Sequence, residues 1–466
     1  GGRLSFVVTN KWLKAAYGEP LRRYFAQESW VESVVDFGHA KQIFEDADVF
    51  PSIIVARKPT DEPAPATTRV CAIPRQQLRI NDLAAQIQSE GFDVERTRLS
   101  NEAWSLDPKA AYDLLAKMRD KGESLSRITQ SKPYYGVKTG FNEAFVIDTS
   151  TKNRLVSADP RSSDLIRPYL RGQDVKRWSP EWAGYWMIFT RRGVDIDAYP
   201  TIRDHLQTFR EGLEPKPKDW VGGSWKGRKP GAYQWFETQD PVDYWKLFEQ
   251  PKILYQDITW RPSFCLDRNG TLSNDTTFFI PSANSWVLAV LNSPISWWYA
   301  WRTVYHGKDE ALRLKSIFMQ DYPIPNPTDE QSRDSENATM RLIELARQRQ
   351  DTTRHLLDWL KVEHEISEPS IKLKDSLNLG SDSLVAEVKK LRGKKNPLSL
   401  AALKNLREEY ERTVTPAQAL AREALGLERR VSDLVNQAYG LTPEEVSLMW
   451  ATAPPRMPIP APPSSA

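Results

Sequence analysis

The sequence predicts an α/β N-terminal segment, then a mixed and mostly β central region, then an α-helical C-terminal region. Three observations predict this class. Short β-branched runs flank a helical pattern in the first sixty residues, tryptophan, glycine and proline concentrate in the middle, and long helical patterns follow residue 331. With 466 residues, the chain is long enough for about three domains.

Residues 1–60 have the pattern of a sheet with one helix. Predicted strands cover 4–8, 31–37 and 49–56, and a helix is predicted over 12–28, where Leu13, Tyr17, Leu21 and Phe25 lie four apart. Sixty residues cannot bury both faces of such a sheet. We therefore interpret this segment as the tail of a larger sheet, followed by a linker or bridging region over 61–124 that ends in a helix near 108–118.

Residues 125–330 hold twelve of the 17 tryptophans and many short apolar runs, which predict a mostly β domain with a few helices. From 331 to 452 the predicted helices cover 338–362, 384–391, 400–411, 416–439 and 443–450. The tail, 453–466, is rich in proline, and we expect it to be disordered.

Composition excludes several classes of protein. Two distant cysteines, Cys71 and Cys265, exclude a disulfide framework, an iron–sulfur cluster and a cysteine-based zinc site, and favour a reducing, cytoplasmic location. The five histidines show no ligand spacing, so we assign no metal. No apolar run reaches eighteen residues, so we expect no membrane span. A net charge of +3 permits nucleic-acid binding but does not by itself indicate it.

Three short motifs resemble those of known catalytic sites. Asp36-Phe37-Gly38 lacks the other protein-kinase motifs, so a strand ending at a glycine turn is the better interpretation. Residues 222–229 resemble a phosphate loop, but Arg228 stands where lysine is required, which favours an exposed basic loop. Asp382, Glu387 and Lys389 match a loose nuclease pattern, yet they lie in a predicted helix, so we expect a solvated helix face.

The chain starts at Gly1-Gly2-Arg3-Leu4, without a methionine or a leader, and we expect it to be a fragment of a longer protein.

The first sixty residues resemble a known family. Leu4-Ser5-Phe6-Val7-Val8, Val34-Val35-Asp36-Phe37-Gly38 and Pro51-Ser52-Ile53-Ile54-Val55 are similar to the late half of the Rossmann-like domain of N6-adenine DNA methyltransferases. The closest resemblance is to the bifunctional type IIG restriction–modification enzymes, and to relatives that share a TaqI-like specificity domain.

The central region resembles the target-recognition domain of the same family. The matching segments are 135–145, 166–175, 251–258, 290–294 and 322–325, and they keep the order of the family. The resemblance implies that residues 125–330 recognise a short site in double-stranded DNA.

The resemblance also implies where the chemistry lies. A methyltransferase of this type needs a glycine-rich turn for S-adenosylmethionine and an Asn/Asp-Pro-Pro-aromatic tetrapeptide for the flipped adenine. Neither motif occurs in this sequence, so we expect the catalytic half upstream, no cofactor bound by this chain alone, and an inactive chain. Phe44 matches an aromatic residue that packs on the flipped base, and ordinary core packing is its alternative role. Mg²⁺ would be needed only if an upstream nuclease domain exists.

Basic side chains on loops are the candidates for contacting DNA, because they neutralise phosphates and reach guanine edges. For each one, a solvated surface charge is the simpler interpretation. The candidates are Lys138, Arg171, Lys176, Arg177, Lys226, Arg228, Lys229, Arg261, Arg313 and Lys315.

These inferences together predict the C-terminal part of a site-specific adenine-N6 DNA methyltransferase that supplies target recognition. The alternatives are a non-enzymatic DNA-specificity subunit or decoy that recruits a separate catalytic chain, and a helical scaffold with a degenerate methyltransferase remnant. The sequence leaves open the recognised bases, DNA cleavage by the parent protein, the role of the helical region and the oligomeric state.

Overall fold

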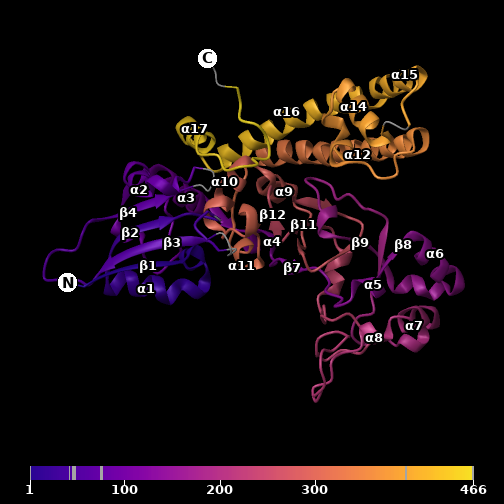
Figure 1. The fold of residues 1–466 in the computed structure, drawn as a ribbon, viewed down its shortest axis with the longest axis horizontal. Helices are drawn as coiled ribbons and strands as arrows, with labels where there is room; N and C mark the ends of the chain where they lie inside the picture. Colours follow the sequence, from indigo (N-terminus) through magenta and orange to yellow (C-terminus); the bar gives the residue numbers. More distant parts are fainter. Residues whose placement is uncertain (1, 41, 45–48, 74–76, 394–395, 464–466) are drawn as a thin grey trace.

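The computed structural model describes residues 2–40, 42–44, 49–73, 77–393 and 396–463. Figure 1 shows a mixed α/β arrangement of three parts. A sheet-containing N-terminal part, drawn in indigo and purple, lies beside a central region of short strands and helices. Two long helices, drawn in orange and yellow, run along the top of the central region.

The N-terminal sheet has five strands in the order β1-β3-β2-β4-β5. Their bounds are β1 (Arg3–Thr9), β2 (Trp30–Asp36), β3 (Pro51–Arg57), β4 (Thr67–Ala72) and β5 (Phe92–Glu95). Strand β3 is antiparallel to β1 and β2, and β2 is parallel to β4, so β1, β2 and β4 end at the same edge of the sheet. Val34, Ile54, Val70 and Val94, one from each of four strands, share one buried cluster.

Two strands of this sheet come from the segment expected to be a linker. Val70 in β4 and Val94 in β5 are each at most 2% exposed. The linker predicted for 61–124 is therefore in part incorrect, because β4 and β5 complete the sheet. The same segment contains α2 (Leu83–Glu90) and α3 (Lys109–Lys121).

The first helix is shorter than predicted. Helix α1 covers Glu19–Glu28, with proline in its first turn, and two 3₁₀ turns precede it. The buried Arg22 guanidinium donates hydrogen bonds to the carbonyl oxygens of Trp12 and Ala15. A Cβ at Gly18 would lie 2.2 Å from the Trp12 carbonyl oxygen, so the chain turns tightly before α1 begins.

Strand β1 forms one edge of the sheet and is unusually exposed for an apolar strand. Leu4, Phe6 and Val7 are 50%, 56% and 50% exposed. Tyr17 and Tyr24, before and within α1, are also exposed. An edge strand with this composition presents backbone groups and apolar side chains that another polypeptide can cover.

The central region is more mixed than the sequence predicted. Its strands are two to five residues long: β6 (Gly122–Ser124), β7 (Tyr134–Tyr135), β8 (Val146–Asp148), β9 (Ile166–Leu170), β10 (Tyr185–Ile188), β11 (Lys252–Gln256), β12 (Ile258–Thr259), β13 (Cys265–Asp267), β14 (Leu272–Ser273), β15 (Thr277–Ile280), β16 (Leu312–Arg313) and β17 (Pro323–Pro325). Its helices are α4 (Leu125–Thr129), α5 (Asn142–Phe145), α6 (Thr149–Ala158), α7 (Pro200–Gln207), α8 (Arg210–Leu213), α9 (Ser285–Asn292), α10 (Pro294–Thr303) and α11 (Ser316–Met319). Two four-stranded sheets, β14-β9-β10-β8 and β13-β11-β15-β7, organise the strands.

The C-terminal region consists of α12 (Asp329–His364), α13 (Ile371–Lys374), α14 (Ser381–Arg392), α15 (Leu400–Glu409), α16 (Thr415–Ala438) and α17 (Pro443–Ala451). Helix α12 has 36 residues and is therefore about 54 Å long. Ion pairs join Asp334 to Arg430 and Arg341 to Glu423, so α12 and α16 run antiparallel.

The helical region contributes to two hydrophobic cores. Leu342 of α12 and Leu434 of α16 pack in the same buried cluster as α9 and α10 of the central region. At the far end, Leu360 and Val414 belong to a separate cluster with α13, α14 and α15. The hydrophobic core therefore continues across residue 331, and only the distal end of the helical region has a core of its own.

The proline-rich tail is anchored over much of its length, which corrects the prediction of disorder over 453–466. The Trp297 indole donates a hydrogen bond of 3.1 Å to the Pro455 carbonyl oxygen. Ile459 is only 5% exposed. The tail therefore packs as a strap up to Ile459, residues 460–463 are exposed, and residues 464–466 lie outside the described part of the chain.

The Asp36-Phe37-Gly38 motif has the structural role that we expected, whereas the solvated helix face predicted for Asp382, Glu387 and Lys389 is in part wrong, because Glu387 is buried. Asp36 ends β2, where its Oδ1 atom accepts a hydrogen bond from the backbone N–H of Gly38, a residue with φ of +54°. Asp382 and Lys389 lie on α14. Among the described residues, no helix combines the length and the apolar character needed to cross a bilayer.

Candidate nucleic-acid interface

The ten predicted DNA-binding cations differ in exposure. Lys176, Lys226, Lys229 and Arg261 are exposed, Lys138, Arg171, Arg177, Arg313 and Lys315 are partly buried, and Arg228 is buried. An exposed cation can reach a phosphate directly, whereas a buried one is already engaged within the protein. The local partners of each group decide which of them can contact DNA.

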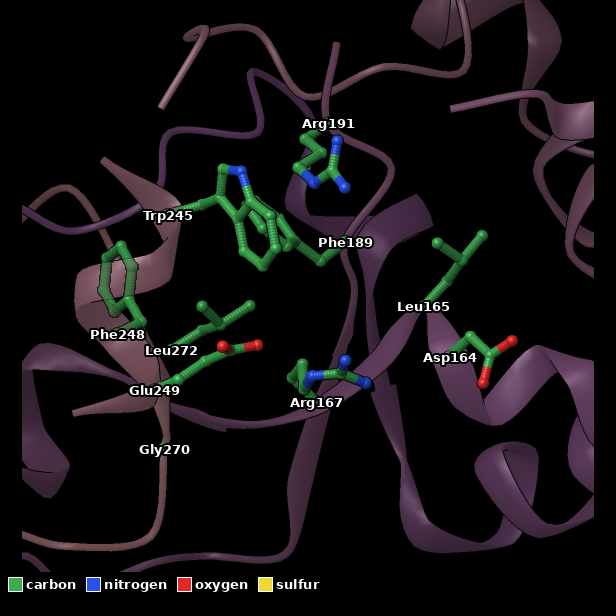
Figure 2. Close-up of a pocket in the computed structure, with 10 residues that line it drawn as sticks. All are labelled: Asp164, Leu165, Arg167, Phe189, Arg191, Trp245, Phe248, Glu249, Gly270 and Leu272. Carbon is green, nitrogen blue, oxygen red and sulfur yellow. The ribbon is translucent and has the colours of Figure 1, made fainter. Parts of the chain in front are cut away.

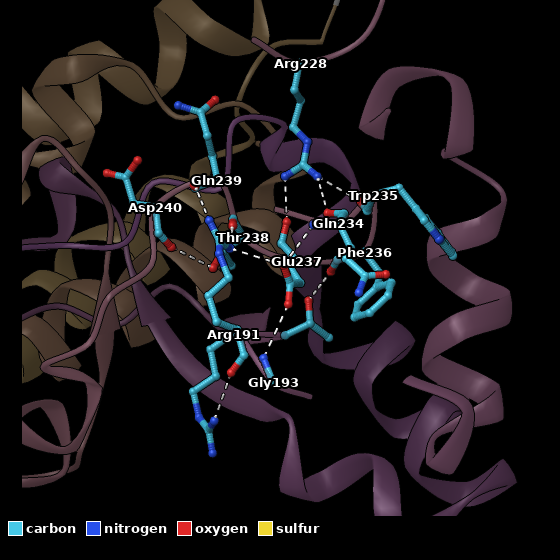
Figure 3. A network of polar contacts seen from close by, with 12 residues as sticks. Arg191, Gly193, Arg228, Gln234, Trp235, Phe236, Glu237, Thr238, Gln239 and Asp240 are labelled. Atoms are coloured by element: carbon cyan, nitrogen blue, oxygen red, sulfur yellow. Dashed lines mark hydrogen bonds and ion pairs between the residues drawn. The ribbon is translucent and has the colours of Figure 1, made fainter. Parts of the chain in front are cut away.

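Arg228 is a structural residue, and its assignment to the DNA-binding set is corrected. Its guanidinium is 3% exposed and donates hydrogen bonds to five backbone carbonyl oxygens. Figure 3 shows three of these acceptors, on Gln234, Trp235 and Glu237, surrounding its tip. Burial lowers the pKa of Arg228 to about 10, so the group stays charged at neutral pH.

The neighbouring lysines remain on the surface, as expected of an exposed basic loop. Lys226 is 78% exposed and forms an ion pair of 2.9 Å with the exposed Glu211. Lys229 is also exposed. Surface ion pairs of this kind contribute little to stability, so Lys226 can exchange its contact with Glu211 for phosphate.

Two arginines on the strands and turns of the central region are tied to buried carboxylates. Arg171 pairs with Asp174 at 2.8 Å, and Arg313 pairs with Asp257 at 2.7 Å. Arg171 also lies over the ring of Tyr185. A guanidinium fork engaged in this way offers fewer donors to a guanine edge. Their roles in base recognition, like those of Lys138 and Lys315, stay predictions.

Three predicted cations converge on a single cleft, which we call the tail cleft. Its volume is about 410 Å³ and its lining comprises Lys176, Arg177, Arg261, Pro262, Ser263, Arg456, Met457 and Pro458. Sequence reasoning missed Arg456, because it lies in the tail that was expected to be disordered. Its only signal was a cation between Pro455 and Met457. The cleft therefore joins the central region to the C-terminal strap.

A smaller polar pocket lies where β2 and β4 end. It has a volume of about 150 Å³ and includes Lys14, Asp36, Arg302 and His306. The Asn10 amide donates to Asp36 Oδ1 at 2.8 Å. Burial raises the pKa of Asp36 and lowers the pKa of Lys14. Sequence reasoning named Asp36 only as the end of a strand and missed the other members, which come from four other segments of the chain.

His306, in this pocket, makes the stability of the folded chain sensitive to acid. Burial lowers its pKa from 6.5 to about 3, and its Nε2 atom lies 2.9 Å from the Trp301 carbonyl oxygen. The unfolded chain takes up the proton near pH 6.5, while the folded chain resists it down to about pH 3. The contribution to stability is therefore complete above pH 6.5 and is lost as the pH falls.

Because of His306, the free energy of unfolding of the wild type is expected to fall by about 2 kcal/mol between pH 7.5 and pH 5. We expect His306→Gln to lack this fall. Urea unfolding at both pH values measures this difference. The exposed His355 on α12 provides the matched control, His355→Gln. Parallel pH profiles for wild type and His306→Gln would contradict the assignment.

Phe44 lies outside the hydrophobic core. Its ring is 43% exposed, and it follows a turn at residues 42–43. Phe44 is therefore not in the core formed by the described residues of this chain. The stacking role implied by the resemblance stays a prediction.

A further pocket in the central region is lined by both apolar rings and charged groups. Figure 2 shows Arg191 close to Trp245, with Arg167 and Glu249 at the opposite side. The Arg191 guanidinium lies 4.3 Å from the Trp245 ring centroid. The pocket has a volume of about 140 Å³, which is close to that of a cavity that holds one benzene ring.

Three family models match separate parts of the chain. Residues 167–324 match the TaqI-like C-terminal specificity domain, and residues 1–44 match the Eco57I restriction-modification methylase. Residues 328–435 match a domain of unknown function. Each match covers less than half of the chain, and two of the three are to restriction–modification methylases or their specificity domain.

Individual proteins are similar to most of this chain. The type II methyltransferase M.XhoI of Xanthomonas vasicola is 27% identical over 63% of this chain and 52% of its own length. M.PaeR7I of Pseudomonas aeruginosa is 24% identical over 71% of this chain and 56% of its own length. A solved structure of the type IIL enzyme MmeI in complex with DNA covers 97% of this chain and 49% of its own, with 14% identity and a TM-score of 0.48.

The chain is thus similar to type II restriction–modification methyltransferases, and its residues 167–324 resemble a TaqI-like specificity domain. It spans about half the length of the two curated relatives described above.

Proposed function

We propose that this chain recognises a short duplex DNA site on behalf of an adenine-N6 DNA methyltransferase of the type IIG class. The observation that carries the proposal is the match of residues 167–324 to the TaqI-like specificity domain. Without Arg228, nine predicted cations remain, and six of them lie between Arg171 and Arg261. The exposed ones supply charge for phosphate contacts, which dominate the affinity of proteins for DNA.

The N-terminal sheet has a second role in this proposal. It supplies the last strands of the Rossmann-like catalytic domain, and the remainder of that domain covers the exposed edge of β1. Leu4, Phe6 and Val7 support this assignment, because their apolar side chains and the unpaired backbone of an edge strand favour another strand beside them.

The described residues around the ends of β2 and β4 do not fit S-adenosylmethionine, the methyl donor that the parent protein would use. The pocket where β2 and β4 end has about 150 Å³, which is less than the 300–1,000 Å³ typical of cofactor sites. It is lined by Lys14, Asp36 and Arg302, which are engaged with one another and with Asp107. We therefore derive no methyl-transfer step from this chain.

Binding of duplex DNA under a salt gradient tests the proposal. Lys226→Ala combined with Lys229→Ala is expected to weaken binding and to lower the slope of log affinity against log salt by about 2, because each phosphate contact contributes about 0.9. Arg228 is left intact in this variant, since its loss would disturb the fold. Fluorescence anisotropy of a labelled duplex measures both quantities.

The exposed pair Lys389 and Lys390 on α14 gives a control with the same change of charge. Their double alanine variant is expected to retain the wild-type slope. Equal slopes for all three proteins would remove the 226–229 loop from the interface, and failure of the wild-type chain to bind duplex DNA would reject the proposed function.

A further inference from the structure

The tail cleft is built for an anion. Its lining contains four cations, Lys176, Arg177, Arg261 and Arg456, and no carboxylate. Two of these cations have a carboxylate nearby outside the lining: Arg177 pairs with Glu428, and Lys176 lies 3.9 Å from Glu181. Positively charged groups therefore outnumber the carboxylates at the cleft.

The inner wall of the cleft is rigid. Glu428 Oε1 accepts hydrogen bonds from both Arg177 and the Trp178 indole, and the Asn292 carbonyl oxygen accepts a second bond from Arg177 at 2.7 Å. Trp178 is 4% exposed and has φ of +71°, a conformation that few residues other than glycine adopt. Such an unfavourable backbone conformation persists only where the surroundings impose it.

The outer wall is the anchored tail, which holds Arg456 over the cleft. Before Arg456, Thr452 accepts bonds from the Trp298 indole at 2.9 Å and from Arg302 at 2.9 Å. After it, Ile459 is buried. Arg456 itself has φ of +60° and is exposed. The tail thus carries an arginine at a position where glycine would be less strained, and places it in the same lining as Arg261.

We propose that the tail cleft binds a phosphate group, with Arg261 and Arg456 as its two principal contacts and Lys176 at its rim. Guanidinium groups match phosphate because they donate two parallel hydrogen bonds while neutralising charge. The phosphate belongs to a phosphodiester of the bound DNA or to a free phosphate compound. The first source rests on the proposed function, and the second does not.

The test uses Arg261→Gln, Arg456→Gln and the double variant in the full chain. The matched control is Arg268→Gln, because Arg268 is an exposed arginine of the same region that does not line the cleft. Thermal unfolding of each variant in phosphate-free buffer checks that the fold is retained.

Two binding measurements separate the sources. In the first, anisotropy of a labelled duplex is followed under a salt gradient, and the double variant is expected to lower the slope by about 2. In the second, inorganic phosphate is titrated at constant ionic strength, with thermal unfolding as the readout. The wild-type midpoint is expected to rise, and that of the double variant to stay constant.

The outcomes are distinct. A change confined to the duplex measurement assigns the cleft to the DNA backbone, and a change confined to inorganic phosphate assigns it to a free phosphate compound. If the double variant matches wild type and Arg268→Gln in both measurements, the cleft is not a phosphate site. If wild type does not bind duplex DNA but its phosphate response depends on Arg261 and Arg456, the proposed function fails and the cleft stands.

Discussion

Replacing Arg228 with methionine is expected to lower the free energy of unfolding by about 3–5 kcal/mol. The methionine side chain has a similar length but donates no hydrogen bond, so five backbone carbonyl oxygens lose this donor, and within the described part of the chain only those of Thr139 and Gln234 keep a backbone N–H. These acceptors lie on Thr139, Leu213, Gln234, Trp235 and Glu237, and they connect three segments of the central region. Their separation in sequence makes Arg228 a cross-link of the fold.

Urea unfolding followed by tryptophan fluorescence measures this loss. The neighbouring exposed Lys229 is the control, and Lys229→Met is expected to change stability by no more than about 0.5 kcal/mol. If Arg228→Met were as stable as Lys229→Met but bound DNA more weakly, the original assignment of Arg228 to the DNA interface would be restored.

A second large loss of stability is expected when the buried ion pair between β11 and β13 is broken. Lys252 Nζ lies 2.6 Å from Asp267 Oδ2 and 2.7 Å from the Phe248 carbonyl oxygen, and both side chains are fully buried. Burial lowers the pKa of Lys252, while the nearby Asp267 opposes this shift. Lys252→Met leaves an unpaired buried carboxylate, so we expect a loss of about 3–5 kcal/mol.

The double variant Lys252→Met with Asp267→Leu separates the cost of a lone charge from the value of the pair. Because replacing both members of a buried pair by apolar groups is often close to neutral, we expect it to be more stable than Lys252→Met. The double variant is not expected to regain the full stability of the wild type, since Asp267 also accepts hydrogen bonds from the backbone N–H groups of Asn269 and Thr271. A double variant as unstable as the sum of the two single variants would contradict this explanation.

Strands and helices with strong local patterns could be predicted from the sequence. The β-branched run at residues 4–8 lies within β1, and the helical spacing of 416–439 corresponds to α16. Strands β4 and β5 were missed, because Arg69 and Asp93 interrupt their apolar alternation and pair with one another at 3.6 Å near the sheet edge. Their burial depends on β2, which no local pattern reveals.

The candidate site was harder to predict, because exposure depends on distant partners. Lys226, Arg228 and Lys229 look alike in sequence, yet only Arg228 meets carbonyl groups supplied by residues as far away as Thr139. The tail was misjudged for a related reason. Proline-rich composition predicts disorder, but Trp297 recognises a backbone carbonyl oxygen, and backbone acceptors leave no trace in composition.

Helix α12 is continuous over its whole length, so a small tilt at one end displaces the other end by a larger distance. Its first half is fixed in the core shared with α9 and α10, and its last turns are fixed in the distal core with α13 to α15. Because one continuous helix spans both, a tilt of about 5° at its base displaces the far end, about 54 Å away, by about 5 Å. Any rearrangement of the central region that reaches α9 is therefore expected to move the distal helices by a larger distance.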